Sequence, residues 1–302
     1  MEHFFRMVDI QTLLFLYMAV GYLCRKLRLF REEATTTLTD FSLYIALPCM
    51  VFQSFRMEFS AEVLKRGTSA LIVAFAGAIC ALILGKLLFG RMHPDKGRIM
   101  QYGTLVSNAG FAGLPVAEAG YGTEGLLIGS IYIIPTRILM WSAGISLFTD
   151  APLKERLRRV MLNPGIIAVI LGLIRMVTQI VIPARIDQAL TTLGNCTTPV
   201  AMIVVGMILA DTDMKEVPEL SVLVLILVRQ ILLPFLTLFM LRLVPVDETV
   251  RGIAVLITGM PIGSTTTLLA AKYGANTSFS SKCVFFSTLT SLITVPLLAL
   301  FL

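Results

Sequence analysis

SNAGFAGLPVAEAGYG at residues 107–122 and TGMPIGSTTTLLAAKYG at residues 258–274 are the two stretches that decide the fold of this chain. Both lie in long apolar runs, yet each carries glycine and a proline, and the second adds a run of hydroxyl side chains. Proline removes an amide donor and clashes with the preceding turn, while glycine permits non-helical backbone angles. We therefore expect two helices that are broken in the middle of a membrane, near Pro115 and Pro261.

The composition of the whole chain places these stretches in lipid. Of the 302 residues, 56% are hydrophobic and only 15% are charged, whereas soluble domains carry roughly 25% charged residues. Ten apolar runs, each near the length of roughly 20 residues that a spanning helix needs, fill the chain and leave no room for a soluble catalytic domain. The runs lack the alternation of polar and apolar residues that is typical of a membrane barrel, so they are helices. The sequence thus predicts an all-α polytopic membrane protein with ten transmembrane helices.

The two broken segments also belong to a repeat of long period. The tripeptide GLP at 113–115 recurs as GMP at 259–261, and the pair Tyr-Gly at 121–122 recurs at 273–274. Each half of the chain holds five apolar runs, an odd number, so the second half must lie upside down relative to the first, as in the inverted repeats of secondary transporters. The predicted organisation is a first five-helix repeat (1–150), a basic cytoplasmic linker (151–163) and a second, inverted repeat (164–302), with helices four and nine as broken crossover helices.

The basic residues predict the orientation of the chain. Loops on one side of the expected membrane carry 14 of the 25 Lys and Arg residues, whereas the side with both termini carries 7. Because cytoplasmic loops are enriched in Lys and Arg, we expect both termini on the non-cytoplasmic side of the inner (plasma) membrane. The net charge of +6 is scattered between apolar runs and forms no basic stripe, so a nucleic-acid partner is not expected and the lipid bilayer is.

A helix that is broken in lipid exposes amides and carbonyls, which is tolerable only where they line a wet cavity or a bound solute. The half-helices that begin near the two prolines would offer free amides and a positive dipole end, which suit a carboxylate better than a cation. Asn108 can donate and accept with one side chain, and hydroxyls follow the second break. The expected substrate-binding residues are Asn108, Gly110, Gly113, Pro115, Gly259, Pro261, Ser264 and Thr265.

Charged residues inside the apolar runs are further candidates. A charge at the centre of a bilayer costs roughly 2.5 to 3.5 kcal/mol even on a mild insertion scale, so each needs a partner or water. Arg229 is the preferred candidate for a place on the substrate path, ahead of Arg137, and the role of Arg175 stays open. Glu118 and Asp40 are candidates for coupling transport to Na⁺ or H⁺.

The chain offers no metal-ligating or catalytic constellation. His3 and His93 lie in polar stretches, and the five cysteines fall within apolar runs without a CxxC pair. We therefore expect no metal, no cofactor and no enzymatic activity.

On several motifs the chain resembles the auxin efflux carrier family, which includes bacterial permeases for malate, malonate and similar acids. SNAGFAGLP resembles the family's first crossover, and MPIGSTTTLLAAKYGAN at 260–276 resembles its second. The second, sixth and seventh helices of the family are matched by LTDFSLYIALPCMVF at 38–52, NPGIIAVILGLI at 163–174 and TPVAMIVVGMILA at 198–210.

This resemblance implies a scaffold part (helices 1, 2, 6 and 7) beside a transport part (helices 3–5 and 8–10), a homodimer, and an elevator-like alternation. It also implies substrate contacts at Asn108, at Pro115 and around Pro261. The segment 150–163 is much shorter than the central loop of the long plant members, which favours a bacterial organic-acid permease over an auxin carrier.

The predicted function is therefore a secondary transporter for a small organic anion, a mono- or dicarboxylate. Two alternatives stay open at this point. One is a sodium- or proton-coupled carrier of a neutral or aromatic solute, and the other is an anion sensor or channel that does not transport.

Overall fold

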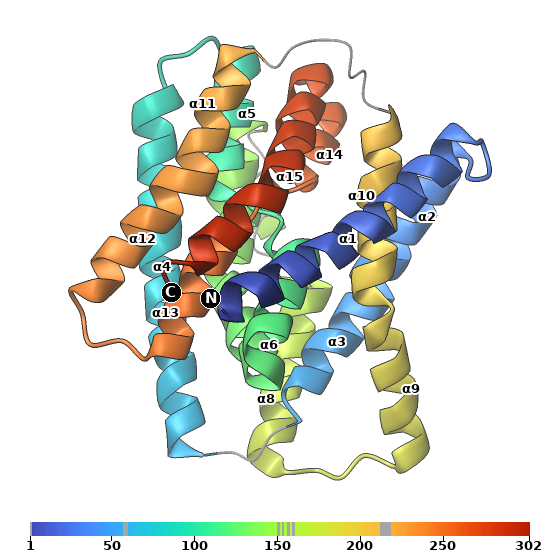
Figure 1. Cartoon of the computed structure of the whole chain (residues 1–302), viewed down its shortest axis with the longest axis vertical. Helices are drawn as coiled ribbons and strands as arrows, with labels where there is room; N and C mark the ends of the chain where they lie inside the picture. Colours follow the sequence, from blue (N-terminus) through green and yellow to red (C-terminus); the bar gives the residue numbers. More distant parts are fainter. Residues whose placement is uncertain are drawn as a thin grey trace.

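The computed structural model describes residues 2–56, 60–149, 152, 154–155, 158, 161–211 and 219–302, and this part of the chain is helical throughout (Figure 1). Much of the predicted linker 151–163 lies outside the described residues. The α-helices are α1 (Glu2–Lys26), α2 (Glu32–Phe41), α3 (Leu47–Ser54), α4 (Ala61–Phe89), α5 (Pro94–Leu105), α6 (Leu114–Leu139), α8 (Pro164–Thr178), α9 (Ala184–Asn195), α10 (Thr197–Asp211), α11 (Leu220–Leu227), α12 (Leu233–Arg242), α13 (Glu248–Thr258), α14 (Thr265–Lys272) and α15 (Thr277–Ala299).

Short π-helical segments join several of these helices into longer ones. They are η1 (Ser42–Ala46) between α2 and α3, η2 (Ala109–Gly113) before α6, η3 (Met140–Gly144) after α6, and η5 (Val228–Leu232) between α11 and α12. Within the described residues, seven helices are long and apolar enough to cross a membrane. The number is lower than the ten predicted spans because two segments are interrupted after Leu105 and Thr258 and α8 has only 15 residues. The ten-helix count and the inverted repeat therefore remain predictions.

One group of helices approaches backbone to backbone. In Figure 1, α1 crosses α10 diagonally, and a Cβ atom at Gly21 or at Gly206 would lie 2.0 Å from a carbonyl oxygen of the other helix. On the same side of the molecule α3 packs on α8 and α9, and Gly172 of α8 leaves room for the ring of Phe55. Glycine at these crossings permits a contact that any larger residue would force apart.

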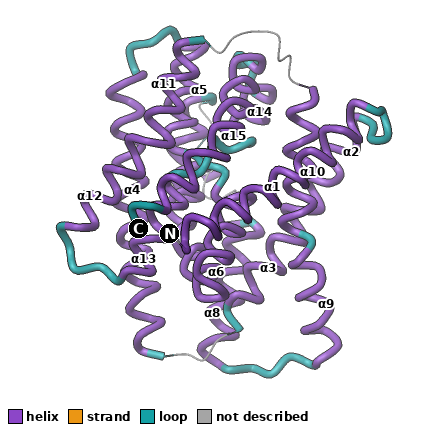
Figure 2. Tube along the Cα trace, viewed as in Figure 1, coloured by secondary structure: helices purple, strands orange, loops and turns teal. Residues whose placement is uncertain are grey.

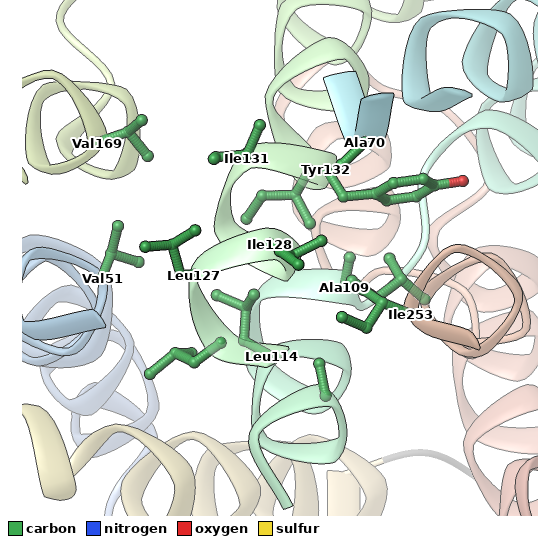
Figure 3. Packing of buried hydrophobic residues seen from close by; sticks show 14 of the residues in the cluster. Val51, Ala70, Ala109, Leu114, Leu127, Ile128, Ile131, Tyr132, Val169 and Ile253 are labelled. Carbon is green, nitrogen blue, oxygen red and sulfur yellow. The ribbon is translucent and has the colours of Figure 1, made fainter. Parts of the chain in front are cut away.

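A second group surrounds α6. Leu127 and Ile128 of α6 are almost fully buried, and they share a hydrophobic cluster with Ala70 of α4 and Ile253 of α13 (Figure 3). The same cluster reaches Val51 of α3, so it also joins this group to the first. The core thus fixes α6 in the centre of the bundle.

The repeated Tyr-Gly pair forms the same kind of turn in both halves of the chain. Gly122, which interrupts α6, has φ +68°, and Gly274, between α14 and α15, has φ +67°. These left-handed angles favour glycine over residues with a side chain. Figure 2 shows loop segments in the middle of the bundle as well as at its ends, which is where the two interrupted segments meet.

Candidate functional site

The two interrupted segments cross and are joined by their backbones. Helix α5 ends at Leu105 and α13 at Thr258, and Ser107 and Ile262 then face each other in an isolated antiparallel bridge. The amide of Asn108 donates to the carbonyl of Pro261 at 2.7 Å, and the amide of Gly263 donates to the carbonyl of Val106 at 3.1 Å. Backbone groups that the breaks release therefore satisfy one another across the crossing.

This arrangement corrects the expected position of the first break. The first segment is interrupted at Val106–Asn108 and continues as a π-helix from Ala109, so Pro115 lies inside a continuous helix. Pro115 also does not line the cavity that lies beside the crossing. Near Pro261, the amide of Gly263 is taken by the bridge, and that of Ile262 donates to Oγ of Ser287 at 3.1 Å. These two amides are thus not available to a solute. Pro115 is the second residue of α6, directly after the π-helical segment η2, and the helix continues through it without a break.

A cavity opens beside the crossing, on the side where η2 and α14 begin after the two breaks. It encloses about 550 Å³, including its open mouth, and we call it the Arg137 cavity. Its walls come from the first residues of η2 and α14, from α6, and from Thr39 and Leu43 of α2 and η1. The described lining residues are Thr39, Leu43, Val106, Ser107, Asn108, Ala109, Gly110, Phe111, Ile133, Thr136, Arg137, Met140, Gly263, Ser264 and Thr265. Two helix N-termini, which carry partial positive charge, therefore face one space.

Among the described residues of this lining, Arg137 alone carries a formal charge. Its guanidinium lies against the backbone of Gly110, because a Cβ atom there would be only 2.3 Å from Nη2. Among the described residues no carboxylate forms an ion pair with Arg137, and no acidic side chain lines the cavity. A half-buried cation inside the membrane is costly when it has no partner, so this one is suited to a ligand of opposite charge.

Neutral polar groups surround this cation. Asn108 is buried, and its side chain lines the cavity together with Ser264 and Thr265. Tyr102, fully buried beneath, donates a long hydrogen bond of 3.4 Å to Oγ1 of Thr265. In the described part of the chain, the amides of Ala109 and Gly110 at the start of η2 have no acceptor. The cavity thus combines one guanidinium with amide and hydroxyl donors, which are the groups that bind a carboxylate.

Arg229, the preferred arginine of the sequence analysis, lies elsewhere. It belongs to η5, is 4% exposed, and Nη1 donates to the carbonyl of Thr104 at 2.9 Å. It lines a smaller cavity of about 320 Å³, including its open mouth, which we call the Arg229 cavity and which shares Ser107 and Thr136 with the Arg137 cavity. The full lining is Ala74, Gly77, Ala78, Ala81, Leu105, Ser107, Tyr132, Thr136, Arg229, Ile257 and Thr258.

The predicted glycines have different positions. Gly110 lines the Arg137 cavity, whereas Gly113 packs against Met260, whose Cγ would be 3.2 Å from an added Cβ. Gly259 makes room for Leu298. These last two glycines therefore allow close packing at the crossing and do not line the cavity.

Arg175 belongs to an ion-pair network on the other group of helices. It donates to Oε1 of Gln53 at 2.6 Å and to Oδ1 of Asp187 at 2.8 Å, and Arg56 pairs with the same Asp187 carboxylate at 2.9 Å. Its guanidinium also lies 5.1 Å from the ring centroid of Phe52. These contacts hold α8, α3 and α9 together and place Arg175 outside both crossing cavities.

The two acidic candidates do not line the Arg137 cavity either. Glu118 is exposed on α6 and faces a separate cavity with Gln53 and Thr191, between α6 and the helices α3 and α9. Asp40 is exposed on α2, next to Thr39. Among the described residues no group of three His, Cys, Asp or Glu side chains could hold a metal ion.

The sequence places Arg137 second to Arg229 as a candidate, whereas in the structure Arg137 lines the cavity at the starts of η2 and α14 and Arg229 does not. The run IPTRILMW gave no sign that its arginine lies on the crossing, because this depends on the packing of α6 against η2. The available signal was Gly110 within the first crossover, since a glycine there leaves space for a large neighbour.

Comparison with known proteins finds relatives that match almost the whole chain. A protein of Methanocaldococcus jannaschii named "Uncharacterized transporter" is 24% identical over 303 residues, which covers 96% of this chain and 97% of that one. A protein of the same description from Methanothermobacter thermautotrophicus is 25% identical over 291 residues, or 92% of each chain. A Rhizobium meliloti protein named "Putative malonate transporter" is 24% identical over 295 residues, covering 91% of this chain and 89% of that one.

The family model described as "Membrane transport protein" matches residues 9–299, almost the whole chain. This match confirms the resemblance that the crossover motifs predicted and makes the protein a multi-pass membrane protein whose role is transport rather than enzymatic catalysis. The chain belongs to the membrane transport protein family of auxin efflux carriers and their relatives.

Proposed function

We propose that this protein is a secondary transporter that carries a small organic anion, a mono- or dicarboxylate, through the Arg137 cavity. The observation that carries the proposal is the guanidinium of Arg137, which has no carboxylate partner among the described residues and lies in a cavity lined by two helix N-termini and Asn108. The "malonate" in the name of the Rhizobium meliloti relative makes malonate the first acid to test.

The charge balance of the cavity favours an anion over a neutral solute. One guanidinium and the positive ends of η2 and α14 face the same space, and no acidic side chain among its described lining residues offsets them. A carboxylate can accept two parallel hydrogen bonds from a guanidinium, and amides at a helix start add further donors. A neutral or aromatic solute would leave this positive charge without compensation.

The position of the cavity supports alternating access. One wall comes from the crossing and from α6, and the other comes from Thr39 and Leu43, which lie on the α2–η1 segment that adjoins α3. If the α6 group slides against the group formed by α1, α3, α8, α9 and α10, the bound anion travels with the crossing. This is the elevator-like movement that we propose. The group formed by α1, α3, α8, α9 and α10 corresponds to the predicted transmembrane helices 1, 2, 6 and 7, which form the scaffold part.

The remaining features of the proposal come from the sequence and the family resemblance. They are two inverted five-helix repeats, a homodimer, a place in the inner membrane and termini on the non-cytoplasmic side. Glu118 and Asp40 lie outside the Arg137 cavity, so in this proposal neither contacts the substrate.

Uptake into proteoliposomes tests the function. Purified protein is reconstituted, and the uptake of labelled malonate, malate, succinate, acetate and lactate is measured with and without a preloaded counter-substrate. We expect saturable uptake of at least one acid, accelerated by counter-substrate, and a strong loss in Asn108→Ala. Binding of an acid without counterflow would favour a sensor, and currents of unitary size would favour a channel. Equal uptake by the wild type and Asn108→Ala would contradict the proposed site.

A further inference from the structure

Arg229 lies where the ends of two helices create a site for a cation. Helix α5 ends at Leu105 and α13 at Thr258, and both terminal residues line the Arg229 cavity. The last carbonyls of a helix carry partial negative charge. In transporters with discontinuous helices, such C-terminal ends and unwound carbonyls coordinate the coupling ion.

The rest of the Arg229 cavity is also suited to a cation. Ser107, Thr136 and Thr258 contribute hydroxyls, and Oη of Tyr132 lies 3.1 Å from Oγ1 of Thr258. No carboxylate lines the cavity within the described residues. These neutral oxygens, together with the carbonyl of Thr104, are the ligand type that hard cations prefer.

The guanidinium of Arg229 already occupies this position. Nη1 donates to the Thr104 carbonyl at 2.9 Å, at the end of α5. Nε is buried without a hydrogen-bond partner among the described residues, and the whole residue is 4% exposed. An arginine with a purely structural role would have its donors satisfied or paired with an acid, as Arg175 does with Gln53 and Asp187.

We infer that Arg229 is a built-in cation that takes the place of a coupling ion at the crossing, so that anion binding in the neighbouring Arg137 cavity needs no bound sodium ion. Arginine is protonated at every physiological pH, and a second cation on the same oxygens would be repelled by it. This inference rests on the proposed function, because it concerns whether the proposed anion transport needs a coupling ion. Because the charge of Arg229 is permanent, the crossing can bind the anion without first binding an ion from solution at this position.

Thermal unfolding of the detergent-solubilised protein tests this inference without any transport assay. The unfolding temperature is measured in sodium chloride and in choline chloride at equal ionic strength, for the wild type, Arg229→Ala, Arg229→Lys and Arg242→Ala. Arg242 is the matched control, since it belongs to the adjoining α12 and also donates to a backbone carbonyl, that of Phe301 at 3.2 Å, but is exposed and distant from the crossing. A low concentration of guanidinium chloride is then added to each.

We expect the wild type, Arg229→Lys and Arg242→Ala to show the same unfolding temperature in sodium and in choline. Arg229→Ala frees the oxygens, so sodium should raise its unfolding temperature above the choline value, and guanidinium should raise it further. A sodium-specific stabilisation of the wild type would overturn the inference. An Arg229→Ala protein that responds to neither cation would also overturn it.

If Arg229→Ala cannot be purified, Arg229→Gln replaces it. A sodium-specific stabilisation of the wild type would still overturn the inference without any variant. Uptake separates this inference from the proposed function. A wild type that carries no acid but shows no sodium response contradicts only the function. A wild type whose KM for the acid rises about tenfold when choline replaces sodium contradicts only the built-in cation.

Discussion

Two arginines lie on opposite sides of one crossing, and their surroundings assign them opposite tasks. Arg137 faces the beginnings of η2 and α14, so its positive charge adds to the positive ends of two helices. Arg229 faces the ends of α5 and α13, so its positive charge offsets their negative ends. The direction of the neighbouring helices, rather than the residue type, is therefore the reason why we propose that Arg137 attracts an anion and that Arg229 replaces a cation.

The exposure of the two residues agrees with this difference. Arg229 is almost fully buried and bonded to a backbone carbonyl, whereas Arg137 is half-buried at a cavity with an open mouth. In the function that we propose, the substrate contacts Arg137 directly, while Arg229 acts through the backbone of the crossing.

The largest expected effect comes from removing the charge of Arg137. Arg137→Gln should lower kcat/KM for the transported acid by about 100-fold, the order seen when a preorganised donor to a developing or bound anion is lost. Arg137→Lys should retain part of the activity because it keeps the charge but loses the bidentate geometry. The measurement is initial uptake into proteoliposomes. Arg242→Gln is the control. An equal loss of uptake in Arg242→Gln would show that Arg137 has no special role in anion binding.

A third arginine sharpens the comparison because it is fully paired. Asp187→Asn removes the carboxylate that holds Arg175 and Arg56, at 2.8 Å and 2.9 Å, and should lower the free energy of unfolding by about 2 kcal/mol. The KM for the substrate should stay unchanged, because the network lies outside both crossing cavities. Chemical denaturation and uptake are measured on the same preparation, and a raised KM with unchanged stability would place the network on the substrate path.

Gly110→Ala tests the position of the Arg137 guanidinium without changing any charge. The added Cβ atom would meet Nη2 at 2.3 Å, so the guanidinium must move and the KM should rise about tenfold. Gly67→Ala is the matched control, since Gly67 lines neither crossing cavity and its Cβ would meet the flexible end of a side chain, Cδ1 of Ile131, at 3.1 Å. Similar KM values for the two variants would show that the exact place of the guanidinium does not matter.

The smallest effect is expected at the backbone of the second break. Ser287→Ala removes the acceptor of the Ile262 amide, which should cost about 1 kcal/mol of stability and leave the charge pattern of both cavities intact. A thermal unfolding curve measures this loss. A large loss of transport at normal stability would instead assign Ser287 a direct role in binding.

Sequence reasoning recovered the membrane class, the family and the two interrupted segments, because composition, hydropathy and the Pro-Gly motifs are local signals. It misplaced the first break at Pro115, since the bridge between Ser107 and Ile262 forms between residues that are far apart in the chain. It also ranked Arg229 above Arg137. Depth along an apolar run is visible in a sequence, but which helix ends surround a side chain depends on how α6 and η5 pack against the crossing. The repeat and the scaffold division remain predictions.

Ligand-dependent thermal stabilisation of the wild type and of Arg137→Gln is the most direct test of the claim that Arg137 organises an anion site. A panel of mono- and dicarboxylates, including malonate, is titrated against both proteins in sodium and in choline. The account predicts that at least one acid stabilises the wild type equally in both salts and that no acid stabilises Arg137→Gln. An acid that stabilises both proteins to the same extent would contradict it.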